Sequence, residues 1–262
     1  MIAIFILMIH SIETLAYAVR LSGVRVRLLA SALSLFNMMV MVSRLANMMQ
    51  QPFTGSLVDK APSETAFVFV ENQFRFIIGF ASIGTLLGIL CLPTFIAIFS
   101  RAIIHLGEER GSIVALLKKG FTFSYLRRGM QLIRKPSLSY LRGISLKDMP
   151  VQLFVINIVI TAIYTIGVLS ALYASLLIPD YKTTAIMVSG LINGVATILL
   201  IVFIDPKISI LADDVLNNKG SYIDLKRVSL LMMSSRFLGT LFAQVLFIPG
   251  AHYVAWFTRF IV

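Results

Sequence analysis

Residues 151–177 read VQLFVINIVITAIYTIGVLSALYASLL and contain no charged side chain. An α-helix needs about 20 predominantly apolar residues to cross a bilayer, so this run predicts a transmembrane helix. Further apolar runs predict spans at about 2–19, 28–50, 76–100, 184–204 and 229–250. The sequence therefore predicts an all-α polytopic membrane protein, with six transmembrane helices in a single membrane domain over residues 1–262.

The overall composition also indicates a membrane protein. Of the 262 residues, 58% are hydrophobic and only 13% are charged, whereas about 25% of the residues of a soluble domain are charged. Lys and Arg outnumber Asp and Glu by 23 to 12. No recognition module accompanies this excess, so we expect no nucleic-acid partner. The single cysteine, Cys91, excludes an intrachain disulfide and is interpreted as a packing residue.

Basic residues gather on one side of the predicted spans. Most of the Lys and Arg residues lie in segments 20–27, 105–150 and 205–229, which all fall on the same side if there are six spans. Segments 51–75 and 179–183, on the other side, contain few. Cytoplasmic loops of membrane proteins are basic. We therefore expect both termini outside and the basic segments in the cytoplasm.

The segment 105–150 is the longest predicted connection between spans, and it is not a polar linker. Its apolar and basic residues alternate at helical spacing, which predicts one or two amphipathic helices lying in the cytoplasmic interface. Two interpretations stay open. The segment either anchors the protein to anionic membrane lipids or helps to collect an anionic lipid substrate at the inner leaflet.

Polar side chains lie inside the apolar runs, where even one charge costs about 2.5–3.5 kcal/mol or more. The second span carries a polar stripe at spacings of 7, 3 and 4 residues, formed by Asn37, Arg44, Asn47 and Gln51. This spacing keeps the stripe on one helical face. One alternative is that these side chains only form hydrogen bonds between helices. A hydrated cavity explains the stripe better, because the stripe includes an arginine.

Charged residues of the first and sixth spans extend this polar set. Glu13 and Arg20 share a face of the first span, and Arg236 lies in the sixth. An ion pair between Glu13 and either Arg44 or Arg236 would lower the cost of burying both charges. It is either a structural pair that fixes the order of the helices or a switch that opens when an anion binds Arg44. His10, near the outer end of the first span, is interpreted as interfacial.

Rows of small residues and a repeated sequence pattern indicate how the helices are arranged. Rows of small residues spaced by four predict close helix packing, and these rows are Gly84/Gly88, Gly190/Gly194 and Ser235/Gly239/Ala243. Segments 35–59 and 191–214 both begin Leu-x-Asn, and both carry a proline followed seven residues later by Asp. The two segments would cross the membrane in opposite directions, which suggests an inverted three-plus-three repeat.

Sequence motifs of common enzymes are absent. The chain has no HExxH metal spacing, no phosphate-binding loop ending in Lys-Ser or Lys-Thr, and no GxSxG nucleophile elbow. We therefore expect no catalytic residues, no metal and no cofactor.

The stretches IHSIETLAYAVRLSGVRVRLLASALSLFNMMVMVSRLANMMQQPFTGSLVDKA (9–61) and FIDPKISILADD (203–214) resemble the Amj family, the alternate lipid II flippases of bacteria. The resemblance implies transport of the undecaprenyl-pyrophosphate-linked peptidoglycan precursor from the cytoplasmic to the outer leaflet, for cell wall synthesis. The alternatives are a broader lipid or amphiphile exporter, an undecaprenyl-pyrophosphate phosphatase, and a non-transporting scaffold. The sequence does not decide between a monomer and a homo-oligomer.

If the substrate carries a pyrophosphate, the arginines are its expected ligands, because a guanidinium offers a planar fork to phosphate oxygens. Arg44 and Arg236 are expected to bind the anion, with Arg20 at the cytoplasmic mouth. Amides are expected to bind sugar or peptide groups, and Glu13 to hold the arginines when the site is empty. The expected substrate-binding residues are Glu13, Arg20, Asn37, Arg44, Asn47, Gln51, Asn193 and Arg236.

Overall fold

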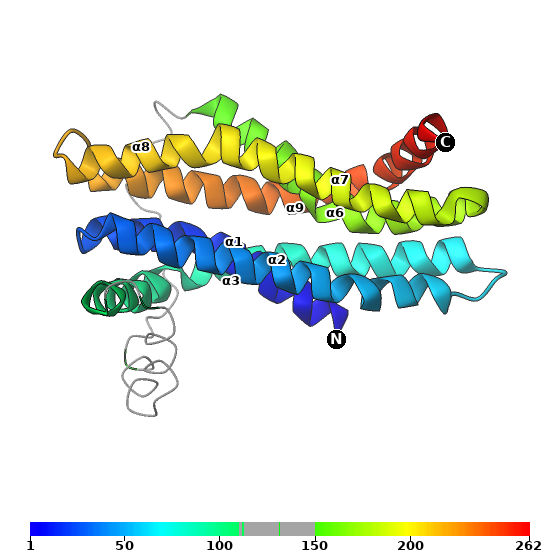
Figure 1. The fold of residues 1–262 in the computed structure, drawn as a ribbon, viewed down its shortest axis with the longest axis horizontal. Helices are drawn as coiled ribbons and strands as arrows, with labels where there is room; N and C mark the ends of the chain where they lie inside the picture. Colours follow the sequence, from blue (N-terminus) through cyan, green and yellow to red (C-terminus); the bar gives the residue numbers. More distant parts are fainter. Residues whose placement is uncertain (110–111, 113–130, 132–149) are drawn as a thin grey trace.

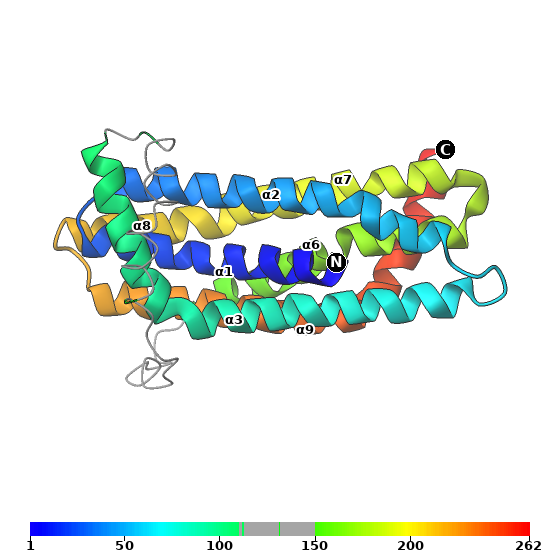
Figure 2. The same ribbon diagram turned by 90° about the horizontal axis from the view of Figure 1, so that it is seen from below.

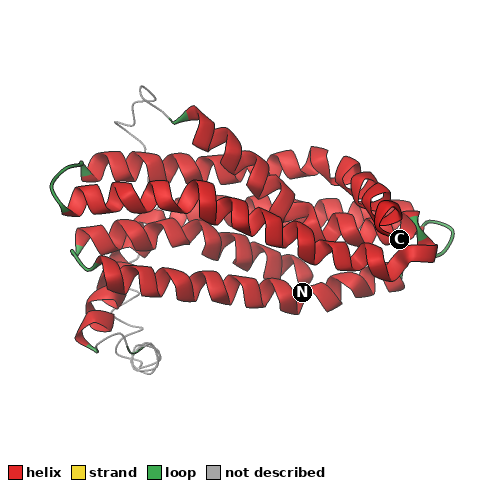
Figure 3. Cartoon of the chain, turned by 45° about the horizontal axis from the view of Figure 1, so that its top comes forward, coloured by secondary structure: helices red, strands yellow, loops and turns green. Residues whose placement is uncertain are grey.

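The computed structural model describes residues 1–109, 112, 131 and 150–262. This part of the chain contains helices and no strand, so the predicted all-α fold is confirmed (Figure 3). The amphipathic helices predicted for 105–150 lie outside the described residues, except that 105–108 belong to the end of the third helix.

Within residues 1–109 and 150–262, the helices follow one another through short turns or directly. The elements are α1 (Ile2–Arg25), α2 (Leu29–Asp59), α3 (Ala66–Glu108), α6 (Val151–Leu177), the 3-10 turn η2 (Pro179–Tyr181), α7 (Lys182–Leu199), the π-helical segment η3 (Leu200–Ile204), α8 (Asp205–Leu216) and α9 (Tyr222–Ile261). Six helical stretches of the described chain are long and apolar enough to cross a membrane, with Pro179–Leu216 counted as one.

Most of these helices are longer than the predicted spans. The run 151–177 coincides with α6, but α3 extends from Ala66 to Glu108 around the predicted 76–100. Similarly, α9 begins at Tyr222 and ends at Ile261, around the predicted 229–250. An apolar run marks only the part of a helix that the bilayer can cover, whereas the helix itself continues until a turn interrupts its hydrogen bonds.

The helices form two triads that lie side by side (Figure 1). One triad consists of α1, α2 and α3, and the other of α6, α7 and α9, with contacts between α3 and α9 and between α1 and α9. In each triad the third helix contains a proline, Pro93 in α3 and Pro249 in α9. A proline removes a helical hydrogen bond and bends the helix, and both helices bend along their length (Figures 1 and 2). These shared features fit the predicted three-plus-three repeat.

The two ends of the bundle differ in charge. The α1–α2 turn, with Arg25 and Arg27, and the α8–α9 turn, with Lys219, lie at one end, which we call the basic end (Figure 1). The α2–α3 and α6–α7 turns lie at the other, the far end, and both termini lie toward it. The predicted separation of basic turns from termini is therefore present in the fold.

Two of the three predicted small-residue rows pack closely. A methyl group on Gly84 would lie 2.3 Å from the Leu7 carbonyl oxygen of α1, and one on Gly239 would lie 2.7 Å from the Ile158 carbonyl oxygen of α6. Only glycine allows such close approach. The prediction is wrong for Gly190 and Gly194, since nothing lies within 4 Å of a methyl group at either position. They lie on a face of α7 that no helix covers.

The core lies between α1, α3, α6 and α9, while α2 and α7 are peripheral. Large apolar side chains of these two helices point away from the protein, for example Met41 on α2 and Met187 on α7, which are 70% and 75% exposed. In a membrane these faces contact lipid. The arrangement places α2 and α7 on either side of an opening between the triads.

Candidate functional site

The larger of two adjoining cavities lies between α2 and α7. It has a volume of about 740 Å³, and α6 forms its third side. Its polar lining residues are Arg44, Asn47, Gln51, Asp59, Lys182, Ser189, Asn193 and Thr197. Asp59 ends α2 and Lys182 begins α7, both at the far end, so the cavity extends from the middle of the bundle to that end. Two of the amides predicted on α2 and the one predicted on α7 therefore face the same space.

The smaller cavity lies deeper in the bundle and has a volume of about 70 Å³. Arg44, Tyr164 and Thr197 line both cavities, so the two adjoin. Glu13 and Arg236 line the smaller one. The predicted charged residues of the first, second and sixth spans are thus brought together by the fold.

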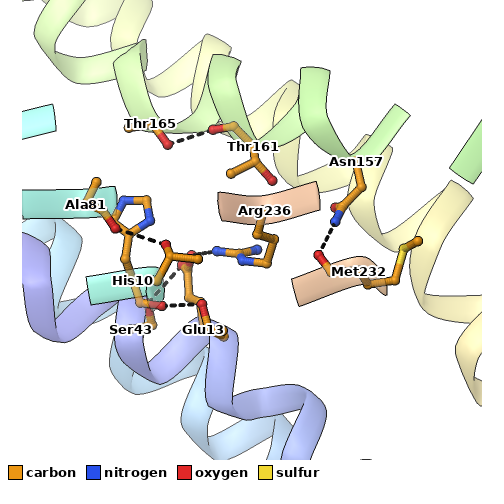
Figure 4. Close-up of polar contacts among 11 residues, drawn as sticks. His10, Glu13, Ser43, Ala81, Asn157, Thr161, Thr165, Met232 and Arg236 are labelled. Carbon is orange, nitrogen blue, oxygen red and sulfur yellow. Dashed lines mark hydrogen bonds and ion pairs between the residues drawn. The ribbon is translucent and has the colours of Figure 1, made fainter. Parts of the chain in front are cut away.

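Glu13 and Arg236 form an ion pair across the triads. The Arg236 guanidinium donates a hydrogen bond through Nη2 to the Glu13 carboxylate, and both side chains are largely buried (Figure 4). The Ser43 hydroxyl of α2 donates a second hydrogen bond to this carboxylate, 2.9 Å long. The pair therefore connects α1, α2 and α9, and it neutralises the charge of Arg236 in this state.

Arg44 has a different environment. It is exposed to the cavities, and its guanidinium has no hydrogen bond or ion pair to another residue in the described part of the chain. A guanidinium carries five N–H donors in a fixed planar arrangement. Arg44 can therefore offer its charge and its donors to an anion that enters either cavity, whereas Arg236 must first separate from Glu13.

Arg20 lies near the basic end and is held by a partner that the sequence did not reveal. Its Nη2 donates a hydrogen bond of 2.9 Å to Asp205 at the start of α8, and the Arg20 side chain is only 3% exposed. The Phe36 ring of α2 covers the guanidinium, with 4.2 Å between the ring centre and Arg20 Cζ. Asp205 and Phe36 line the smaller cavity, so this cluster lies on its basic-end side.

Asn37 is the predicted site residue that lies away from the others. It is exposed on α2 and lines neither cavity, because Phe36 and Val40 occupy the wall of the smaller cavity at that level. His10 also differs from its prediction. It is buried rather than interfacial, at 2% exposure, because α3 covers this part of α1.

Several polar residues of the site were not predicted. Asn157 of α6 is fully buried and donates a hydrogen bond to the carbonyl oxygen of Met232 on α9, one turn before Arg236 (Figure 4). It donates another to the hydroxyl of Ser235, which directly precedes Arg236. The Tyr164 hydroxyl interacts with the Glu13 carboxylate. Asn157 could have been found as a lone amide within an apolar run. Tyr164 and Ser43 could not, because such residues are common in transmembrane helices.

Metal chemistry finds no support in the described residues, since they contain no group of three or more His, Cys, Asp or Glu side chains able to hold an ion.

Comparison with known proteins gives a consistent picture. The sequence model of the Amj family, described as alternate to MurJ, matches residues 5–258. The lipid II flippase Amj of Bacillus subtilis (strain 168) is 58% identical over 255 residues, which cover 97% of this chain and 94% of that protein. No solved structure matches the chain.

Proposed function

Since the chain belongs to the Amj family, we propose that it is a lipid II flippase, which moves the lipid-linked peptidoglycan precursor across the bacterial plasma membrane. Moving a lipid between leaflets breaks no covalent bond, so the protein is a transporter and not an enzyme. Residues 1–262 act in this proposal as one membrane domain. The observation that supports it best is the unpaired Arg44 in a cavity to which both α2 and α7 contribute polar side chains.

The pyrophosphate of the precursor binds at Arg44 in this proposal. Arginine pairs with phosphate through two parallel hydrogen bonds, which are stronger than neutral ones. Asn47, Gln51 and Asn193 line the same cavity and bind the sugar and peptide groups through their amides. A volume of about 740 Å³ suits a ligand of drug size, so the rest of the head group extends out of the cavity toward the far end.

The isoprenoid chain stays in the bilayer while the head group crosses. This requires an opening toward lipid, and the larger cavity lies between the two peripheral helices, α2 and α7. Met48 of α2 lines this cavity and is 66% exposed, so its apolar side chain marks where cavity and lipid meet. The lipid tail would lie against this edge.

Arg236 and Asn37 take part in other stages of the transport cycle. Arg236 joins the pyrophosphate site when the anion competes with Glu13. Asn37 of α2 and Asn193 of α7 occupy corresponding positions in the two similar segments, 35–59 and 191–214. In an inverted repeat, the partner of a residue that faces one end faces the other. Asn37 therefore lines the pathway when the cavity opens to the basic end.

The orientation follows from charge, which also supplies one of three driving forces. The other two are a proton taken up or released by Glu13 and consumption of the precursor at the outer face. The basic end faces the cytoplasm in this proposal, because cytoplasmic loops carry an excess of Lys and Arg, and both termini face outward. An inside-negative potential favours outward movement of an anion by ~2.3 kcal/mol per charge per 100 mV. No nucleotide is needed. One chain forms both cavities.

The test is depletion of this protein in cells that lack other precursor flippases. With the protein present, labelled precursor should become accessible at the outer face and growth should continue. After depletion, precursor should accumulate inside before the cells lyse. Precursor that still reaches the outer face after depletion would contradict the proposal. So would export of another amphiphile while the precursor stays inside.

A further inference from the structure

The cluster of Arg20, Phe36 and Asp205, which we call the basic-end gate, closes the smaller cavity toward the basic end. It joins three elements, because Arg20 comes from α1, Phe36 from α2 and Asp205 from α8. The ion pair is buried on the arginine side and 23% exposed at Asp205. At the far end, the corresponding contact between Lys182 and Asp59 is longer, at 3.4 Å, and both side chains are exposed. The ion pair at the basic end is therefore shorter and more deeply buried than the one at the far end.

Arg20 has binding capacity that the protein does not use. Its Nε and Nη1 atoms are buried and have no hydrogen-bond partner in the described part of the chain. A buried donor without an acceptor costs free energy, and a charged one costs more. Asp205 engages only one of the three guanidinium nitrogens. A ligand with several phosphate oxygens satisfies more of these donors than one carboxylate does.

Asp205 stands directly after an irregular segment of helix. The π-helical η3, Leu200–Ile204, separates α7 from α8, and Pro206 occupies the first turn of α8. π-Helical segments interrupt the regular hydrogen-bond ladder and are frequent at functional sites, while proline removes a further donor. The regular hydrogen-bond ladder is therefore interrupted just before Asp205, and this is the point at which α8 can bend relative to α7.

We propose that Arg20 is a second anion site, at which the substrate's diphosphate displaces Asp205 and opens the basic-end gate. This rests on the proposed function and adds a first step to it. The diphosphate enters from the basic end, takes the place of the Asp205 carboxylate on Arg20, and then passes to Arg44. Asp205 is a positioning residue that closes the path while no substrate is bound.

The gate is tested by cysteine labelling, which does not depend on transport. Val40 lines the smaller cavity between Phe36 and Arg44, so Val40→Cys in a Cys91→Ala background reports whether a membrane-impermeant maleimide reaches that cavity. Lys219→Cys identifies the vesicles whose basic end faces the reagent. Asp205→Asn should increase Val40→Cys labelling from the basic end about tenfold, since loss of a buried pair shifts the population toward the open state.

Two further variants distinguish opening of the basic-end gate from misfolding of the protein. The charge-exchanged double variant, Arg20→Asp with Asp205→Arg, should restore the low labelling. Asp213→Asn makes the same change at an exposed position of the same helix and should leave labelling unchanged. Phe36→Ala removes the aromatic cover and should also increase labelling. Unchanged labelling in both Asp205→Asn and Phe36→Ala would overturn the gate.

The ligand half of the proposal has its own test. Inorganic pyrophosphate added at the basic end should increase Val40→Cys labelling severalfold, and sulfate at equal ionic strength should not. Arg20→Lys keeps an ion pair with Asp205 but loses the planar fork, so the pyrophosphate effect should disappear. If pyrophosphate does not change the labelling of Val40→Cys, the proposal that Arg20 is an anion site is overturned. Normal labelling responses in a protein that does not flip the precursor would instead contradict the proposed function.

Discussion

Glu13 on α1 and Arg236 on α9 form a buried ion pair that ties the first helix of one triad to the third helix of the other. The sequence left two partners open for Glu13, and the fold pairs it with Arg236 while Arg44 stays unpaired. The two arginines therefore differ in function. Arg236 contributes to the connection between triads in this state, and Arg44 provides the available positive charge.

Glu13→Gln should destabilise the protein, because it leaves the Arg236 charge buried without a counter-charge. Removing one partner of a buried ion pair costs about 3–5 kcal/mol. We expect a lower Tm of the purified protein in detergent and a lower abundance in the membrane. The double variant Glu13→Gln with Arg236→Gln removes both charges and should recover most of the lost stability. If Glu13→Gln keeps its Tm and loses only transport, the pair is a switch and not a structural connection.

Arg44→Ala should abolish transport without a loss of stability. The guanidinium has no partner in the described part of the chain, so its removal leaves no buried group unsatisfied. The measurement is rescue of cells that lack other precursor flippases, with the amount of protein determined in the same cells. Arg44→Lys keeps the charge but loses the two-pronged geometry and should rescue weakly.

Arg101→Ala provides the matched control for Arg44→Ala. Arg101 is exposed on α3 and lines neither cavity, so the same loss of charge should leave rescue intact. Full rescue by Arg44→Ala would show that Arg44 does not lie on the transport pathway. The proposed site would then lose its main support.

The spans could be predicted because a membrane helix is encoded locally, by a run of apolar residues. The helix ends could not, since nothing in hydropathy reports how far a helix continues beyond the bilayer. The packing rows were predicted correctly at Gly84 and Gly239 but not at Gly190 and Gly194. A small-residue row indicates that a close neighbour is allowed, and only the fold decides whether one is present.

The site could be predicted where its residues lie on one helix. Arg44, Asn47 and Gln51 face the cavity as their spacing indicates. Contacts between distant segments could be predicted only as alternatives, as for Glu13, or not at all. Arg20 with Asp205 is the clearest case of the second kind, because the two residues lie in different halves of the chain.

Asn157→Ala should cost about 0.6–2 kcal/mol of stability, the range for hydrogen bonds between membrane helices. Asn157 connects α6 to the α9 backbone and to Ser235 through two hydrogen bonds, of 3.0 and 2.7 Å. Its loss should lower the Tm in detergent. Thr165→Ala is the control, because within the described residues the Thr165 hydroxyl bonds only to the Thr161 carbonyl oxygen of its own helix. An equal effect of both substitutions would show that the Asn157 contacts do not hold the two helices together.

Gly194→Leu should block transport by filling the larger cavity. Gly194 lines this cavity, and nothing lies within 4 Å of a methyl group built on it. Leucine is also a better helix former than glycine by about 0.8 kcal/mol, so stability should not fall. Gly84→Leu is the contrasting variant, because its side chain would meet the α1 backbone and should prevent folding. Normal precursor transport by a stable Gly194→Leu protein would show that the head group does not pass through this space.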